Sequence, residues 1–155
     1  MTGKFIEITN LKGKVLTADK VFDSLATATQ YKLMRKAATR SLQHVKKKAQ
    51  SKIPIGKKIH KTYKGSMRGL GFAKRSIVVR AYRKKSENFV LAAVGVKAEA
   101  FYAVNFVELG YRAGKKGKFV RARPWLSVSY NSQKAAVVKT FKSELVEGIK
   151  KEAMK

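Results

Sequence analysis

The segment from Phe101 to Leu126 reads FYAVNFVELGYRAGKKGKFVRARPWL and determines how the middle and the end of the chain are predicted to fold. Its first part is rich in aromatic and β-branched residues, which favours a strand over Ala103–Leu109. Its middle part is basic and contains no acid, which predicts a loop over 110–123. Pro124 stands where a helix readily accepts its first residue, because proline presets φ and needs no N–H partner there. The pattern therefore predicts a strand, a projecting loop and a last helix that begins at about Pro124 or Asn131.

Two further strands are expected before this stretch. Residues 72–83 and 89–97 are rich in valine, isoleucine and aromatic residues, and their short connections favour an antiparallel meander. We interpret the aromatic residues of this region, among them Phe101 and Phe106, as the core of the sheet. A short alternating segment at about 4–17 predicts an additional hairpin at the N-terminus.

A long helix is expected between that hairpin and the sheet. From Ala18 onward, apolar residues recur three or four positions apart, which is the spacing of one helix face. Poor helix formers at Thr27, Thr29 and Tyr31 favour a break there. Ile53 should end the helix, because a residue before proline avoids the α conformation. The chain of 155 residues is thus predicted to form a single α+β domain, in which an antiparallel sheet of about three to five strands packs against this long helix and the C-terminal helix.

Two basic loops, at 55–71 and 110–123, interrupt this scheme. Unstructured loops of such length are uncommon in compact domains and usually serve a function. We therefore expect both loops to act as arms for assembly or for ligand binding. The candidate interface residues are Lys57, Lys58, Arg68, Glu108, Gly110, Arg112, Lys115, Lys116, Arg121 and Arg123.

The net charge is the most unusual property of the chain. It has 36 Lys and Arg against 9 Asp and Glu, a formal charge of +27. Such self-repulsion calls for counterions, nucleic acid or an acidic protein nearby. The absence of cysteine suits an intracellular product or a particle assembled inside a cell. The N-terminus lacks the apolar segment of a signal peptide, and no apolar run is long enough to span a bilayer, so we expect a soluble protein without a membrane partner.

The sequence offers no constellation for catalysis. No acid lies between Asp23 and Glu87, so paired carboxylates are hard to assemble. His44 and His60 are the only histidines, and without cysteines or an acid cluster a zinc site would lack ligands. The glycines miss the pattern of a phosphate-binding loop. We therefore predict no enzyme, no catalytic residue, no metal and no cofactor.

Glu108 and Trp125 are the two residues of the segment Phe101–Leu126 for which we consider a specific role. Glu108 is either an acid at the end of a strand that pairs with one of many nearby cations, or a specific ion pair, within or between subunits, that fixes the following loop. Trp125, after Pro124, is expected to anchor the last helix in the core.

The order of these motifs resembles the phage tail-completion or head–tail joining proteins, the minor tail components of long-tailed phages. In that family a basic helix exits through an Ala-Pro-like turn, a basic loop leads to a strand, a Y-A-x-F-V-E-x-G strand follows, and A-R-P-F-L opens the last helix. The similarity covers roughly residues 30–150. The matching segments are Ala49–Pro54, Phe72–Ile77, Tyr102–Gly110, in which Asn105 adds one residue, and Ala122–Leu126, with Trp in place of Phe.

The resemblance implies a structural virion protein and no enzyme. Members of the family form a ring, hexameric by this comparison, at the neck between capsid and tail, and DNA passes through the lumen. The expected partners are other copies of the chain, other neck and tail proteins and, without sequence specificity, the passing DNA. The expected location is the virion neck or tail, after assembly in the host cytoplasm. The alternative is a basic nucleic-acid-binding protein of the ribosomal or nucleoid type, which the charge alone would favour.

Overall fold

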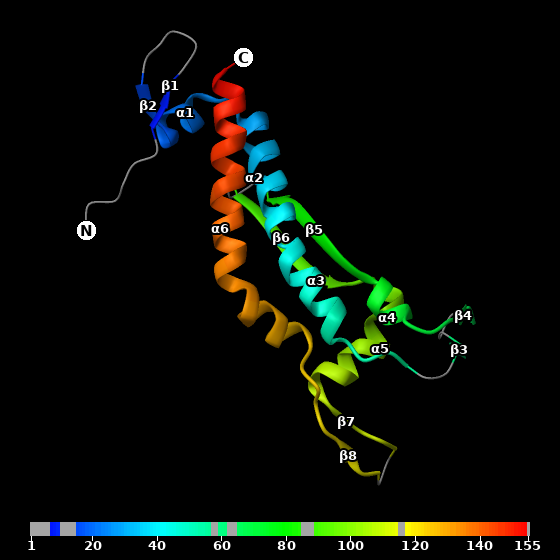
Figure 1. Cartoon of the computed structure of the whole chain (residues 1–155). Coiled ribbons are helices and arrows are strands. Elements are labelled where there is room, and N and C mark those ends of the chain that lie inside the picture. Colours follow the sequence, from blue (N-terminus) through cyan, green and yellow to red (C-terminus); the bar gives the residue numbers. More distant parts are fainter. Residues whose placement is uncertain are drawn as a thin grey trace. The chain divides into compact units, whose positions relative to one another are not determined.

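The computed structural model describes residues 7–9, 15–56, 59–61, 65–84, 89–114 and 117–154. Its fold is mixed helix and sheet, as predicted (Figure 1). No helix in the described part of the chain is both long and apolar enough to cross a membrane. The elements in chain order are β1 (Glu7–Thr9), β2 (Val15–Thr17), α1 (Ala18–Ser24), α2 (Thr27–Ser41), α3 (Gln43–Lys52), β3 (His60–Lys61), β4 (Met67–Arg68), α4 (Phe72–Arg75), β5 (Ile77–Lys84), β6 (Phe89–Val96), α5 (Ala98–Leu109), β7 (Tyr111–Arg112), β8 (Phe119–Val120) and α6 (Leu126–Ala153).

The strands of the described residues pair only two by two: β1 with β2, β3 with β4, β5 with β6, and β7 with β8. The predicted sheet of three to five strands is therefore wrong. The strand expected at 89–97 forms as β6. The strand expected at 72–83 forms only from Ile77 onward, as β5, because Phe72–Arg75 is the short helix α4. The segment that was to add the third strand is the helix α5 instead. At the N-terminus, β1 and β2 form an antiparallel hairpin in which Glu7 lies opposite Thr17.

The contacts within the chain divide it into two compact units. Unit 1 consists of Met1–Ser41, Ala81–Ala92 and Ala136–Lys155, and unit 2 consists of Leu42–Arg80 and Ala93–Ala135. The elements β5, β6 and α6 contribute residues to both units. The single domain expected from the length of the chain stays a prediction.

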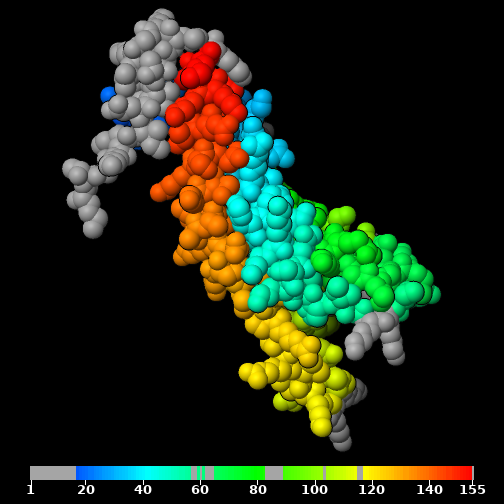
Figure 2. All heavy atoms as spheres, in the orientation of Figure 1, coloured from blue at the N-terminus to red at the C-terminus, as the bar shows by residue number. Residues whose placement is uncertain are grey.

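Unit 1 is built on the contact between α2 and the C-terminal part of α6. Figures 1 and 2 show these two helices side by side, α2 in cyan and α6 in orange and red. Leu33 and Ile149 are buried together with Val21 of α1. A Cβ atom at Gly148 would lie 2.8 Å from the Leu33 side chain, so glycine permits the close approach of the helices.

The break between α1 and α2 lies a little earlier than predicted. Leu25 is extended, with φ −74° and ψ 145°, and α2 begins at Thr27. The Gln30 side-chain amide donates to the carbonyls of Phe22 and Leu25, at 3.0 and 3.1 Å. The Phe22 carbonyl also accepts the Leu25 N–H, so the amide adds to the bonds that close the end of α1, where carbonyl groups lack helical partners. A glutamine in α2 therefore supports the turn.

Unit 2 has its own core. Ala49, Ile53, Ile77, Val104 and Trp125 are buried in one cluster, which draws on α3, β5, α5 and the start of α6. As the following proline predicts, Ile53 is extended, with φ −66° and ψ 129°, and α3 ends just before it at Lys52. The core thus joins the segments on both sides of the candidate arms.

The segment Ala98–Leu109 is the helix α5, so the strand predicted over Ala103–Leu109 is wrong. Its buried residues, Ala100 and Val104, are four positions apart, which is a helical spacing. Alanines and glutamates among the aromatic residues also favour a helix. The extended Lys97 precedes the helix, and Gly110 with φ 75° ends it. Phe101 and Phe106, expected in a sheet core, are instead 58% and 51% exposed on its outer side.

The two predicted loops also contain regular structure. In the first, His60 lies opposite Arg68 in the short antiparallel pair β3–β4. In the second, Tyr111 lies opposite Val120 in the pair β7–β8. Each predicted arm is therefore a hairpin, which gives a projecting segment a defined backbone at its base.

Candidate assembly site

The carboxylate of Glu108 closes the N-terminus of α6. It lies in the last turn of α5, and one oxygen accepts the main-chain N–H groups of Trp125 and Leu126, at 2.7 and 2.9 Å. The other oxygen accepts both the N–H and the hydroxyl of Ser127, at 3.1 and 2.7 Å. The first N–H groups of a helix have no partner within it. Glu108 therefore supplies, from another helix, the acceptor that the start of α6 lacks.

The charge of Glu108 suits this position. Partial burial raises the pKa of its carboxyl, but hydrogen bonds from Leu126, Ser127 and Trp125 together outweigh burial and hold the pKa below its ordinary value of 4.5. The N-terminal end of a helix dipole also favours a negative group. Among the described residues, the partners of the Glu108 carboxylate are thus main-chain N–H groups and the Ser127 hydroxyl. They take the place of the nearby cation that the sequence leads us to expect. Whether Glu108 also meets another subunit stays a hypothesis.

The hairpin β7–β8 leaves this junction through a turn that requires glycine. Gly110 has φ 75° and ψ 168°, a conformation that residues with a Cβ atom rarely adopt. A Cβ atom there would lie 2.7 Å from the carbonyl oxygen of Val120. On the return, the Arg123 N–H donates to the Val107 carbonyl at 2.7 Å. Both ends of the hairpin are therefore tied to the end of α5.

Trp125 anchors the returning chain, as the sequence predicts. It is 3% exposed and packs in the core of unit 2. Its indole N–H makes no hydrogen bond to any described residue. Pro124 is exposed and directly precedes this anchor. Together with Glu108, Trp125 fixes where α6 begins.

Arg68 ties the first arm to the N-terminal end of α5. Its guanidinium donates to Glu99 at 2.6 Å, and it lies over the ring of Phe72, 5.1 Å from the centroid. A cation over an aromatic face is attracted by the ring electrons. Arg68 therefore has a role within the chain, in addition to any role in assembly.

Large apolar side chains remain exposed around the junction. On α5, Leu109 is 66% exposed, and on β8, Phe119 is 64% exposed. Phe106 and Tyr111 contact each other with ring centroids 5.4 Å apart, although both are exposed. Apolar patches of this kind commonly mark protein interfaces. The junction therefore presents apolar surface beside its basic residues.

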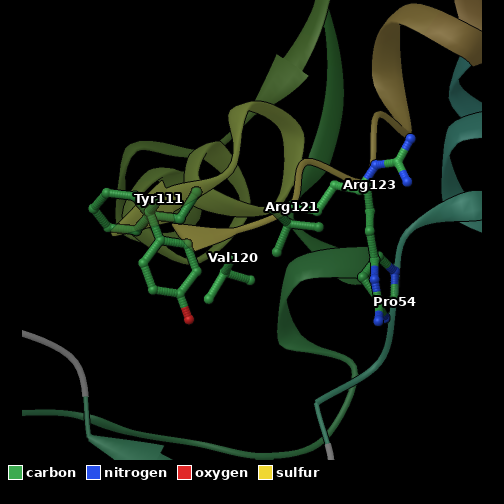
Figure 3. Close-up of a pocket in the computed structure, with 7 residues that line it drawn as sticks. Pro54, Tyr111, Val120, Arg121 and Arg123 are labelled. Atoms are coloured by element: carbon green, nitrogen blue, oxygen red, sulfur yellow. The ribbon is translucent and has the colours of Figure 1, made fainter. Parts of the chain in front are cut away.

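An open pocket of about 360 Å³ lies at the base of the hairpin. Figure 3 shows Tyr111 and Val120 on one side and Pro54, from the segment after α3, on the other. Phe106 and Val107 add apolar lining, and the remaining lining residues are Arg121 and Arg123. Neither guanidinium bonds to another described residue. The pocket thus combines apolar walls with two available positive charges.

The structure brings together most of the predicted site residues and leaves some outside its description. Glu108, Gly110, Arg112, Arg121, Arg123, Pro124 and Trp125 all belong to the junction of α5, the hairpin and α6, whereas Arg68 lies on β4. Lys57, Lys58, Lys115 and Lys116 fall outside the described residues. The pocket residues Pro54, Phe106, Tyr111 and Val120 were not predicted. The sequence signal that could have found Phe106 is the helical spacing of the residues in Phe101–Leu109, which places Phe106 on the outside of a helix.

The charge is concentrated in unit 2. This unit contains twenty lysines and arginines against two acids, Glu99 and Glu108. Both acids already have partners within the unit, Glu99 with Arg68 and Glu108 with the start of α6. Among the described residues, no group of three or more His, Cys, Asp or Glu side chains could hold a metal ion. The positive charge of unit 2 therefore calls for anionic groups from outside the chain.

Comparison with known proteins finds no family model, no curated protein and no solved structure that matches the chain.

Proposed function

We propose that the chain is a structural subunit of a neck or tail-completion ring, which joins a phage tail to the head and lets DNA pass. The subunit acts by binding its neighbours and performs no reaction. In this proposal the interface includes the junction of α5, the β7–β8 hairpin and the start of α6.

The observation that carries the proposal is the way in which the family-like motifs meet at this junction. Glu108 caps α6, Gly110 permits the turn into the hairpin, and Trp125 anchors the return. Three separated motif residues thus serve one purpose, which is to hold a projecting hairpin on a rigid base. A subunit that must present an arm to a neighbour needs such a base.

The exposed surface of the junction also supports a role in assembly. Ring interfaces are heterologous, so that one surface of a subunit meets a different surface of its neighbour. Phe106, Leu109 and Phe119 are each more than half exposed, and a neighbour would remove their apolar area from water. Arg112 and Arg121 lie exposed beside them and would add polar contacts at the rim.

Electron microscopy of the purified protein tests the proposal. We expect closed rings, and we expect the protein to be present in purified particles of the phage that encodes it. The variant Leu109→Asp places a charge on the exposed surface of α5 and should prevent ring formation while the protein stays folded. Lys134→Asp, on an exposed position of α6 in unit 2, is the control and should leave rings intact. Folded protein without rings, and its absence from particles, would count against the proposal.

A nucleic-acid-binding protein is the second candidate, because of the charge of unit 2. Such a protein would bind duplex DNA tightly as a free monomer, with an affinity that falls steeply with salt. The ring subunit should bind duplex weakly when alone. Titration of a fluorescent duplex at several salt concentrations separates the two candidates.

A further inference from the structure

We propose that the pocket at the base of the β7–β8 hairpin binds an acidic peptide segment of another protein, in which carboxylates alternate with aromatic or large apolar side chains. That such a partner meets the chain during assembly rests on the proposed function. The chemical groups that the partner must carry are inferred from the pocket alone.

The lining of the pocket requires both kinds of group. Phe106 and Val120 are 51% and 41% exposed, and with Pro54 and Val107 they form apolar walls. An aromatic or apolar side chain that enters would be removed from water together with these walls. Small-molecule and peptide pockets typically combine such walls with a few polar groups that fix orientation.

The polar groups of this pocket are cations. Arg121 and Arg123 are both exposed and line the pocket two residues apart. The main chain of Arg123 is fixed by its bond to Val107, so the position of its side chain is partly set in advance. Guanidinium groups bind carboxylates through two parallel hydrogen bonds, which adds specificity to the attraction. A carboxylate beside an apolar side chain therefore satisfies the whole pocket.

The occupant should come from a different protein and not from a second copy of this chain. The chain has only 9 Asp and Glu against 36 Lys and Arg, so a second copy offers few carboxylates. Four of these acids, Glu99, Glu108, Glu144 and Glu147, are already bonded within the chain. An acidic segment of another protein complements the positive charge of unit 2, because opposite potentials favour association.

A protein segment fits the pocket better than a nucleic acid. Binding to the phosphate backbone needs a row of cations along the strand, whereas here two arginines lie beside an apolar recess. The recess therefore favours a side chain with a neighbouring carboxylate.

Fluorescence anisotropy with short labelled peptides tests this inference on the full-length protein. The first peptide alternates aspartate and phenylalanine, the second replaces aspartate by asparagine, and the third replaces phenylalanine by glycine. A single-stranded DNA of thymidines is the fourth probe. We expect the first peptide to bind at least about tenfold more tightly than the second or the third, because each of them lacks one of the two required groups.

Two charge-matched double variants locate the binding. Arg121→Gln with Arg123→Gln should weaken the first peptide roughly tenfold or more, since each charge-assisted bond is worth more than a neutral one. Arg80→Gln with Lys97→Gln removes the same charge from exposed positions of unit 2 and should leave binding within about twofold of the wild type. Val120→Asp, which alters the apolar wall, should also abolish binding.

The outcomes distinguish this inference from the proposed function. Equal losses in both double variants, or equal binding of the aspartate–glycine peptide, would show attraction by overall charge and overturn the pocket. Loss of DNA binding confined to the Arg121 and Arg123 variant, without peptide binding, would overturn it in favour of a nucleic acid. Native mass is measured on the same samples. Intact rings without peptide binding refute the pocket alone, and peptide binding by a monomer refutes the ring alone.

Discussion

Replacement of Glu108 by alanine is the perturbation that most directly tests how the fold is held together. The substitution leaves the N–H groups of Trp125, Leu126 and Ser127 without their acceptor, and the Ser127 hydroxyl loses its partner as well. It removes no buried apolar group. A loss of stability in this variant therefore measures the cap.

The size of the effect follows from the four bonds and from their partial access to water. Loss of a helix N-cap costs about 1 kcal/mol and up to about 2 kcal/mol, and hydrogen bonds to charged groups contribute about 1.5–3 kcal/mol where they are shielded. Glu108 is only partly buried, so water replaces part of what is lost. We expect the free energy of unfolding to fall by about 2 kcal/mol, which corresponds to a fall in Tm of roughly 4–8 °C for a chain of this size.

Urea denaturation and thermal unfolding of the purified variant measure this change. Glu147→Ala is the control, because Glu147 lies on α6 in an exposed pair with Lys151 and its loss should leave Tm unchanged. Glu108→Gln keeps one acceptor oxygen and should lie between Glu108→Ala and the wild type. If Glu108→Ala unfolds at the same urea concentration as the control, the carboxylate does not stabilise the start of α6 and the reasoning is refuted.

Further predictions concern pH, the hairpin turn and the core. The pKa of Glu108 is lowered in the folded protein, so its contribution to stability is present above pH 4.5 and is lost as the pH falls through the folded pKa. The difference in free energy of unfolding between wild type and Glu108→Gln, measured in urea, should therefore shrink in acid. A difference that stays constant with pH would contradict the charged cap. Gly110→Ala should cost about 1–3 kcal/mol, because its φ is positive and the Cβ atom would meet the Val120 carbonyl, whereas Gly56→Ala, with open space around it, should be neutral in the same denaturation assay. Trp125→Ala should cost about 3–5 kcal/mol and impair assembly through the fold, and rings with wild-type stability in this variant would show that the anchor is dispensable.

Local chemistry allowed part of the fold to be predicted. The end of α3 before the extended Ile53 follows from the proline after that residue. The strands β5 and β6 follow from runs of β-branched residues. The role of Trp125 as an anchor follows from the one tryptophan in the chain standing where a proline opens a helix. These features depend on residues that are near one another in sequence.

The identity of α5 was missed because its composition and its spacing disagree. Phe101, Val104 and Phe106 favour a strand by residue type, whereas the burial of Ala100 and Val104 follows the period of a helix. A short apolar segment cannot be assigned from composition alone, since both structures accept it. Attention to spacing would have placed Phe106 on the outside of a helix.

The role of Glu108 could not be predicted from local sequence. Its partners lie 17 to 19 residues further along the chain, and only the folded hairpin brings them to its carboxylate. The sequence suggested a cation as partner because lysines and arginines are abundant nearby. The carboxylate binds the start of α6 instead, because three N–H groups there donate to it and the first N–H groups of a helix have no acceptor within the helix.

The native mass of the purified protein separates a ring subunit from a monomer. We expect a single assembly that forms without added DNA and whose mass is an integer multiple of 17.3 kDa, with about six subunits by the family resemblance. Glu108→Ala should shift the population toward smaller species under the same conditions. A species of 17.3 kDa alone, at every protein concentration and in the presence of purified tails, would contradict the claim that this chain is a ring subunit.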